Sequence, residues 1–197
     1  MPKQITDSEI YIAPKILGVI KENKYIVTDE ESNSELDIDN IDDKIFIYER
    51  QVKAWFLDRA KELLNSDDNQ FIILMICVTY FEGVQQYIDG KNSNKASKIF
   101  FVRSVKRIFP SLIDKDLEDL YSDARCGLFH SGMVKKKTIL SNDFPEAIDF
   151  SVTDRIKVNP RKLLEEIIID FDKYLIDLRD SNNVDLRKNF NFLYTFN

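Results

Sequence analysis

The residues best suited to chemistry lie in one segment, Tyr121 to Met133, which contains the only histidine of the chain. Arg125 precedes His130 by five positions, near the end of a predicted helix. A guanidinium group pairs its planar fork with phosphate oxygens and can stabilise the charge of a phosphoryl-transfer transition state. An imidazole can accept or donate a proton near neutral pH. This pair therefore favours proton transfer beside a bound anion, such as phosphodiester cleavage without a metal.

Metal sites have little support in the sequence. One histidine and two separated cysteines, Cys77 and Cys126, cannot build a zinc site. An acidic run near residue 40 is not an EF-hand loop, because the positions for an oxygen ligand, Gly and Glu hold Ile41, Asp42 and Tyr48. We expect a solvated acidic loop, no metal and no cofactor.

Composition indicates an ordinary soluble globular protein. The 197 residues are 44% hydrophobic and 31% charged, enough for one domain with an appendage. The net charge of −6 argues against broad attraction to nucleic acid, although a local basic cleft remains compatible with it. Two cysteines form no disulfide framework, and the first residues lack a signal-peptide core. The longest apolar run, Phe71 to Phe81, is too short to span a bilayer. We expect a cytoplasmic protein with no membrane segment.

The pattern divides the chain into a β-containing N-terminal appendage, residues 1–47, and a helical bundle domain, residues 48–197. In the appendage, three β-branched and aromatic runs are typical of strands: Glu9–Ala13, Lys24–Thr28 and Lys44–Tyr48. In the bundle, apolar spacing predicts helices over about 49–64, 69–89, 95–109, 114–131 and 160–178. A β-hairpin is expected over 137–158, and the tail after 185 is either a short helix or an extended arm.

The helix over 69–89 is apolar on nearly every face, so it must be covered on all sides, in the bundle or at a subunit interface. The next helix is the most basic stretch, with Lys95, Lys98, Arg103, Lys106 and Arg107. These side chains form either a solubilising face or a track for RNA phosphates that leads toward Arg125. Lys135 and Lys136, just after the histidine, are the other candidate RNA contacts.

On an ideal helix, Arg125 lies at the border of the apolar face and His130 lies about 140° further round, so the two side chains do not converge. The backbone could loosen at Gly127. Alternatively, a second copy of the chain could complete one cleft across a two-fold axis. Simpler structural roles also exist. Arg125 could pair with Asp119, Asp123 or a carboxylate of another helix, and His130 could bond to open carbonyls at the helix end.

The segment from Leu120 to Gly132, Leu-Tyr-Ser-Asp-Ala-Arg-Cys-Gly-Leu-Phe-His-Ser-Gly, resembles the signature of the HEPN superfamily. Members are helical bundles that carry an Arg, four to six intervening residues and a His on a late helix. The ending Gly-Leu-Phe-His-Ser-Gly is similar to bacterial members. The resemblance covers about residues 49 to 180 and implies a HEPN-like helical bundle.

The resemblance also implies a metal-independent endoribonuclease, usually a homodimer, in toxin–antitoxin, abortive-infection or CRISPR-linked defence. Arg125 and His130 would be its catalytic pair, RNA its substrate, and an antitoxin or neighbouring protein a further partner. Active members commonly place a polar residue, often Asn, where this chain has Cys126, and some HEPN domains are inactive binding or dimerisation modules. A third possibility, a small-molecule-binding bundle, predicts an enclosed apolar pocket near Tyr80, Phe81 and Tyr87.

Overall fold

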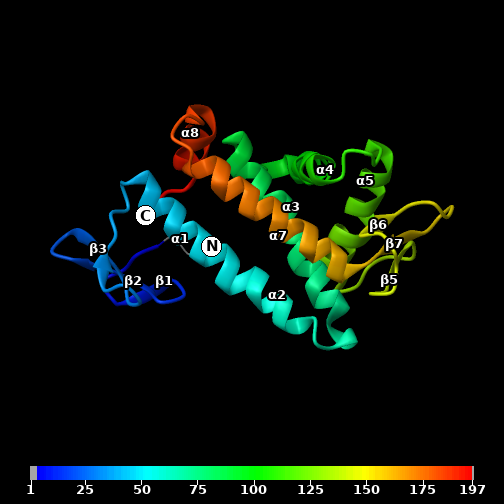
Figure 1. Cartoon of the computed structure of the whole chain (residues 1–197), viewed down its shortest axis with the longest axis horizontal. Coiled ribbons are helices and arrows are strands. Elements are labelled where there is room, and N and C mark those ends of the chain that lie inside the picture. The colour runs from blue at the N-terminus through cyan, green and yellow to red at the C-terminus, as the bar shows by residue number, and fades with distance from the viewer. Residues whose placement is uncertain (1–3, 197) are drawn as a thin grey trace.

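A computed structural model describes residues 4–196 of the chain. The chain is mainly α-helical, as predicted, with two small β-sheets. The sheets lie at opposite ends of an elongated helical body (Figure 1). The prediction of an N-terminal β segment followed by helices is therefore confirmed in outline.

The N-terminal sheet is a four-stranded antiparallel meander. Its strands are β1 (Ile10–Ala13), β2 (Ile16–Lys21), β3 (Lys24–Asp29) and β4 (Ser34–Glu35). The strands β1 and β3 were predicted, whereas β2 and β4 were not. The turn between β2 and β3 is made by Glu22 and Asn23, whose φ angles are 52° and 60°. Two left-handed residues match the right-handed twist of a hairpin, and Asn adopts this conformation readily.

The third predicted strand, Lys44–Tyr48, is wrong, because these residues lie in helix α1 (Ile41–Val52). The side chain of Asn40 caps this helix by accepting hydrogen bonds from the backbone N–H groups of Asp42 and Asp43. Both residues also place carboxylates at the positive end of the helix dipole. This capping outweighs the β preference of the isoleucines that follow. A domain boundary between residues 47 and 48 would cut α1, so the helical part begins at Ile41.

The helix α1 continues through a π-helical turn, η1 (Lys53–Leu57), into α2 (Asp58–Leu63). Near the end of α1 the fully buried Gln51 joins both ends of the chain. Its Nε2 donates to the carbonyl of Ile12 at 2.6 Å, and its Oε1 accepts a hydrogen bond from the hydroxyl of Tyr194 at 2.9 Å. The meander therefore shares a core with the helices.

The apolar helix is α3 (Gln70–Asp89), preceded by the short 3₁₀ turn η2 (Asp67–Asn69). It packs against α4 (Ser97–Ile108), α7 (Pro160–Arg179) and α8 (Val184–Leu193), which confirms its central place. Among residues 4–196 only the stretch Asp67–Asp89 is long and apolar enough to cross a membrane. The core helix of a bundle has the same length and apolar composition. Within the single chain α3 is not covered on all sides, because Ile72 and Met75 are exposed. Coverage of these residues at a subunit interface stays a prediction.

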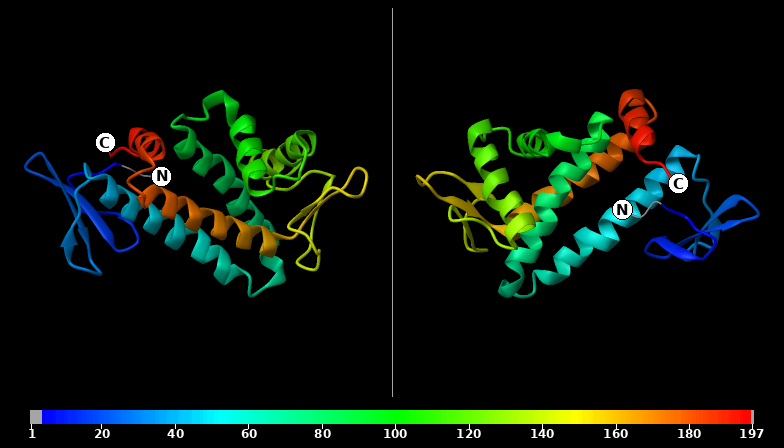
Figure 2. Two further views of the ribbon diagram at one scale, coloured as in Figure 1. Left: turned by 45° about the horizontal axis from the view of Figure 1, so that its top comes forward. Right: turned by 180° about the vertical axis from the view of Figure 1, so that it is seen from behind.

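The long helix α7 runs alongside α1 and α2 (Figure 2). As predicted, Asn159 caps it by accepting a hydrogen bond from the backbone of Lys162, and Pro160 occupies the first turn. The tail forms the helix α8 rather than an extended arm. Before α7 lie β5 (Thr138–Leu140), β6 (Ile148–Asp149) and β7 (Ile156–Val158). Only β6 and β7 pair as a hairpin, and β5 adds in parallel to β7, so a simple hairpin over 137–158 was an incomplete prediction.

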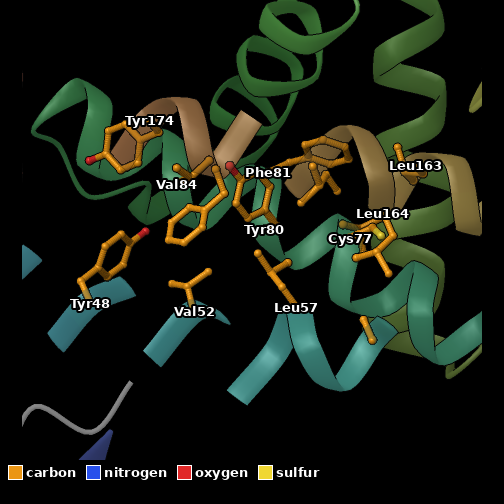
Figure 3. Close-up of a cluster of buried hydrophobic side chains, with 14 of the residues drawn as sticks. Tyr48, Val52, Leu57, Cys77, Tyr80, Phe81, Val84, Leu163, Leu164 and Tyr174 are labelled. Carbon is orange, nitrogen blue, oxygen red and sulfur yellow. The ribbon is translucent and has the colours of Figure 1, made fainter. Parts of the chain in front are cut away.

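Side chains from α1, η1, α3 and α7 meet in an aromatic core (Figure 3). Tyr48 makes edge contacts with Phe171 at 5.7 Å and with Tyr194 at 5.5 Å between ring centroids. The Tyr80 hydroxyl donates a hydrogen bond of 2.6 Å to Asp170. By contrast, the hydroxyl of Tyr174 is buried and makes no hydrogen bond within the described chain.

These two buried tyrosines should respond oppositely to replacement by phenylalanine. Tyr174→Phe removes an unsatisfied polar group, so the free energy of unfolding should stay unchanged or rise by up to about 1 kcal/mol. Tyr80→Phe removes the hydrogen bond to Oδ2 of Asp170, which keeps its ion pair with Arg107, and should lower the free energy of unfolding by about 1 kcal/mol. Urea unfolding measures both. A loss of more than about 1 kcal/mol in Tyr174→Phe would contradict the prediction.

Candidate functional site

Arg125 and His130 lie on one continuous helix composed of α5 (Asp114–Leu120), the π-helical turn η4 (Tyr121–Arg125) and α6 (Cys126–Ser131). The helical backbone does widen in this segment. The wide turn is η4, upstream of Gly127, where the N–H of Cys126 donates to the carbonyl of Tyr121. The residues from Cys126 to Ser131 form a regular α-helix. His130 therefore stays about 140° around the helix from Arg125, and loosening at Gly127 does not bring the two together.

Gly127 has a different role. Because it has no side chain, the segment Met133–Lys135 can pack closely against the helix. A Cβ atom at this position would lie 2.7 Å from the carbonyl oxygen of Met133 and 3.1 Å from the backbone nitrogen of Lys135. The returning segment is fastened by Asp123. Its carbonyl accepts from the N–H of Lys135, and its buried carboxylate accepts hydrogen bonds of 2.8 Å and 2.6 Å from the backbone and hydroxyl of Thr138.

The replacement Gly127→Ala should lower the free energy of unfolding by about 2 kcal/mol, because the new methyl group meets backbone atoms that cannot rotate away. Gly83→Ala on α3 is the matched control, since a Cβ there has no atom within 4 Å. That control should raise stability by up to about 1 kcal/mol through helix propensity. Thermal or urea unfolding compares the two, and equal effects of both changes would contradict the role given to Gly127.

Arg125 is held by a carboxylate from another helix, one of the structural roles anticipated for it. Its Nη2 donates a 2.7 Å hydrogen bond to Oε2 of Glu82 on α3. Both side chains are largely buried, 19% and 16% exposed. The guanidinium also lies over the ring of Phe129 at 4.6 Å and near the ring of Tyr121 at 5.6 Å. These contacts fix its position and offset part of its charge.

Glu82 in turn fastens the loop between α3 and α4. Its Oε1 accepts a 2.8 Å hydrogen bond from the hydroxyl of Ser93, and the backbone N–H of Ser93 donates to the side-chain oxygen of Gln86 at 2.8 Å. Glu82 was not identified from the sequence. The available signal was a single carboxylate that interrupts the apolar pattern of α3, which does not reveal its partner.

The side chain of His130 is exposed and makes no hydrogen bond or ion pair within the part of the chain that the structure describes. It does not bond to the carbonyls at the helix end. There, the N–H of Gly132 donates to Leu128, with Gly132 in the left-handed conformation at φ 69°. In a single chain Arg125 faces Glu82 and His130 faces solvent.

Most basic side chains of α4 have acidic partners. Lys98 pairs with Glu118, Arg103 with Asp89, Lys106 with Asp114, and Arg107 with Asp170. Burial lowers the pKa of Arg107. The side chains of Lys95, Lys135 and Lys136 are exposed and form no ion pair among residues 4–196. The lysines without an acidic partner therefore lie outside α4, in the turn before it and in the segment after α6.

Four apolar side chains on α3 and around α6 are exposed. They are Ile72 and Met75 on α3, Phe129 on α6 and Met133 just after α6, and we call them together the α3–α6 face. Phe129 and Met133 are 48% and 53% exposed, and Ile72 is 51% exposed. The Arg125–Glu82 pair joins the two helices within this surface. Exposed apolar area of this kind is typical of an interaction site.

The described residues contain no group of three or more His, Cys, Asp or Glu side chains that could hold a metal ion. Of the two cysteines, Cys77 is fully buried and Cys126 is partly exposed. Burial raises the pKa of the Cys77 thiol, so this cysteine is a packing residue. No family model, curated protein or solved structure matches the chain.

Proposed function

We propose that the chain is a HEPN-type homodimer that binds and cleaves RNA without a metal, with Arg125 and His130 of both copies around a shared cleft. The observation that carries this proposal is an exposed histidine side chain without a hydrogen bond, on the same helix as a fixed arginine and an exposed phenylalanine. The second support is the resemblance of the segment Leu120–Gly132 to the HEPN signature.

A second copy supplies what one chain lacks. The two side chains point in different directions on one helix, so a two-fold axis near the α3–α6 face would bring His130 of one copy toward Arg125 of the other. Pairing the two faces would also cover Ile72, Met75, Phe129 and Met133.

The reaction that suits these groups is transfer of the phosphodiester to the neighbouring ribose hydroxyl. The 2′ oxygen attacks phosphorus while the bond to the 5′ oxygen breaks, which yields a 2′,3′-cyclic phosphate and a 5′-hydroxyl. His130 would take the proton from the 2′-hydroxyl while water protonates the leaving oxygen, or it would protonate the leaving oxygen while water takes the proton of the 2′-hydroxyl. Arg125 uses only Nη2 toward Glu82, so its other N–H groups can face the phosphate. The setting we propose is cytoplasmic phage defence or a toxin–antitoxin pair, with an antitoxin or neighbouring protein as partner.

The proposal is tested by sedimentation of the purified protein and by incubation with end-labelled single-stranded RNA in EDTA. We expect a dimer at micromolar concentration and fragments that end in a cyclic phosphate. Ile72→Glu should give monomers and lose cleavage. Ile169→Glu, at an exposed isoleucine in the middle of α7, should do neither. A wild-type monomer, or cleavage that needs a divalent ion, would overturn the proposal.

A second function is a non-catalytic dimerisation module, and the Glu82–Arg125 pair favours it. A carboxylate 2.7 Å from the guanidinium opposes the binding of a phosphate at the same group. Cys126 also replaces the polar residue common in active members. This function predicts the same dimer and the same effect of Ile72→Glu on assembly, but no RNA cleavage by the wild-type protein.

A further inference from the structure

A cavity of about 480 Å³ lies between the α1–η1 helix and α3. These two helices diverge from the turn that joins α2 to α3, and the right view of Figure 2 shows them side by side as a V. The pocket expected near Tyr80 and Tyr87 in a small-molecule-binding bundle is therefore present, although Phe81 is not part of its lining. Its volume is within the range of about 300–1,000 Å³ typical of small-molecule sites.

The cavity has a buried floor and an open mouth. Tyr48, Val52 and Val84 line the floor and are at most 7% exposed. At the mouth, Phe56 is 36% exposed and Asn92 is exposed as well. A small molecule can therefore enter from solvent and become covered by packed side chains.

Two local features open this space. The π-helical turn η1 contains both Trp55 and Phe56, and the widened turn lets these consecutive side chains face the same cavity. Across from them, Gly83 lies on α3 with no atom within 4 Å of the position of a Cβ. A larger side chain at position 83 would take up part of this open space.

The lining is aromatic and uncharged. Five aromatic rings contribute to it, those of Tyr48, Trp55, Phe56, Tyr80 and Tyr87. Among residues 4–196 the lining contains no Asp, Glu, Lys or Arg, so a charged ligand would lose its hydration without gaining an ion pair. Burial raises the pKa of Tyr48, and burial raises the pKa of Tyr87 to about 12, so both phenols are uncharged at neutral pH. A lining of this kind suits a flat neutral ring.

The hydroxyl of Tyr48 in this lining has no partner. It makes no hydrogen bond with any residue among 4–196, although the side chain is only 3% exposed. Figure 3 shows this hydroxyl pointing from α1 toward α3. Buried O–H groups without an acceptor are rare in native proteins, because they lose hydration and gain nothing in return. An acceptor atom on a bound molecule would satisfy this group.

Other polar side chains of the lining are already engaged. The hydroxyls of Thr79 and Tyr80 and the amide of Gln86 donate hydrogen bonds within the protein. The carboxamide of Asn92, at the mouth, makes no hydrogen bond with a described residue. Tyr48 therefore offers a donor inside the cavity, and Asn92 offers a polar group at its entrance.

We infer that this cavity binds a neutral aromatic compound that carries a hydrogen-bond acceptor, such as a ring nitrogen or a carbonyl oxygen. The ring of the ligand packs among the aromatic side chains, and its acceptor takes a hydrogen bond from the hydroxyl of Tyr48. This inference rests neither on RNA cleavage nor on a dimer. Its failure is therefore distinguishable from failure of the proposed function.

Trp55 is the only tryptophan of the chain, so the N–H signal of its indole ring in a nitrogen–proton NMR spectrum reports directly on the cavity. Titration of the labelled full-length protein with quinoline, in a mildly alkaline buffer that keeps quinoline neutral, should shift this signal saturably. Quinoline-2-carboxylate, which adds a negative charge, should bind several-fold more weakly. The absence of a saturable shift at millimolar quinoline, or tighter binding of the carboxylate, overturns the inference.

Tyr48→Phe tests the hydrogen bond. This change removes the donor and should weaken quinoline binding about 5-fold, the typical effect of one neutral hydrogen bond. It should leave the binding of naphthalene unchanged, because naphthalene has the same shape as quinoline and no acceptor. Wild-type affinity for quinoline in Tyr48→Phe, or an equal loss of affinity for naphthalene, overturns the inference.

Tyr174→Phe is the matched control. The hydroxyl of Tyr174 is also buried and makes no hydrogen bond within the described chain, but this residue does not line the cavity. Its replacement should leave the affinity for quinoline at the wild-type value. A loss equal to that of Tyr48→Phe would show a general effect of removing a buried phenol and overturn the inference.

Gly83→Leu tests the location of the ligand. It should weaken the binding of both quinoline and naphthalene at least about 10-fold, because the new side chain occupies the space of the ring. The midpoint of thermal unfolding should stay or rise, since leucine favours the helix over glycine. Wild-type affinity in the folded Gly83→Leu protein would place the ligand elsewhere and overturn the inference.

Discussion

Replacing His130 by alanine should reduce RNA cleavage in EDTA by at least about 100-fold and leave the midpoint of thermal unfolding unchanged. The loss follows because general acid–base catalysis typically contributes about 10²- to 10⁴-fold in rate. The unchanged stability follows because His130 is exposed and has no hydrogen bond in the described chain.

The control for this change is Ser131→Ala, at the next position of α6 and also exposed. It should retain the wild-type rate. RNA binding, measured by filter retention with an RNA pentamer whose 2′-O-methyl riboses prevent cleavage, should persist in His130→Ala because the lysines and Arg125 remain. Cleavage that survives the loss of His130 would remove this residue from the reaction and leave the dimerisation module as the better proposal.

The change Glu82→Ala should lower the free energy of unfolding by about 2–3 kcal/mol. Breaking a buried ion pair costs about 3–5 kcal/mol because the remaining charge loses its partner, and the slight exposure of this pair reduces the cost. Ser93 also loses its acceptor, so the α3–α4 loop loosens. The double variant Glu82→Ala with Arg125→Met should recover part of the loss, since no unpaired charge remains between Tyr121 and Phe129.

The matched control is Glu118→Ala, which breaks the ion pair with Lys98 at 3.0 Å. Both partners of that pair are about half exposed, so the change should cost less than about 1 kcal/mol. Urea unfolding of the four proteins measures the difference. Equal losses in the two single variants would show that the Glu82–Arg125 pair behaves as an ordinary surface pair.

Much of the helical part could be predicted because its signals are local. The apolar spacing of α3 and α7, and Asn159 with Pro160 before α7, are properties of neighbouring residues. The error at Lys44–Tyr48 had a local cause as well. A run of isoleucines and aromatics fits a strand or a buried helix, and the deciding residue, Asn40, precedes the run. The unpredicted strand β2 depended on recognising Glu22–Asn23 as a left-handed turn.

Only part of the candidate site could be predicted from the sequence. Arg125 and His130 stand close together in the chain, so their types and spacing could be recognised. The partner of Arg125 is 43 residues away, and the chain offers many carboxylates, so only packing selects Glu82 over Asp119 or Asp123. The π-helical turn at Tyr121–Arg125 is likewise set by how the helix packs, with no sequence signature of its own.

The amide of Gln51 couples two distant parts of the chain. It donates to the carbonyl of Ile12 in the meander and accepts a hydrogen bond from the hydroxyl of Tyr194, just after α8. The meander therefore obtains its complete packing only when the segment around Tyr194 is also in place. Removing α8 together with Tyr194 should loosen strand β1, although the two lie far apart in the sequence.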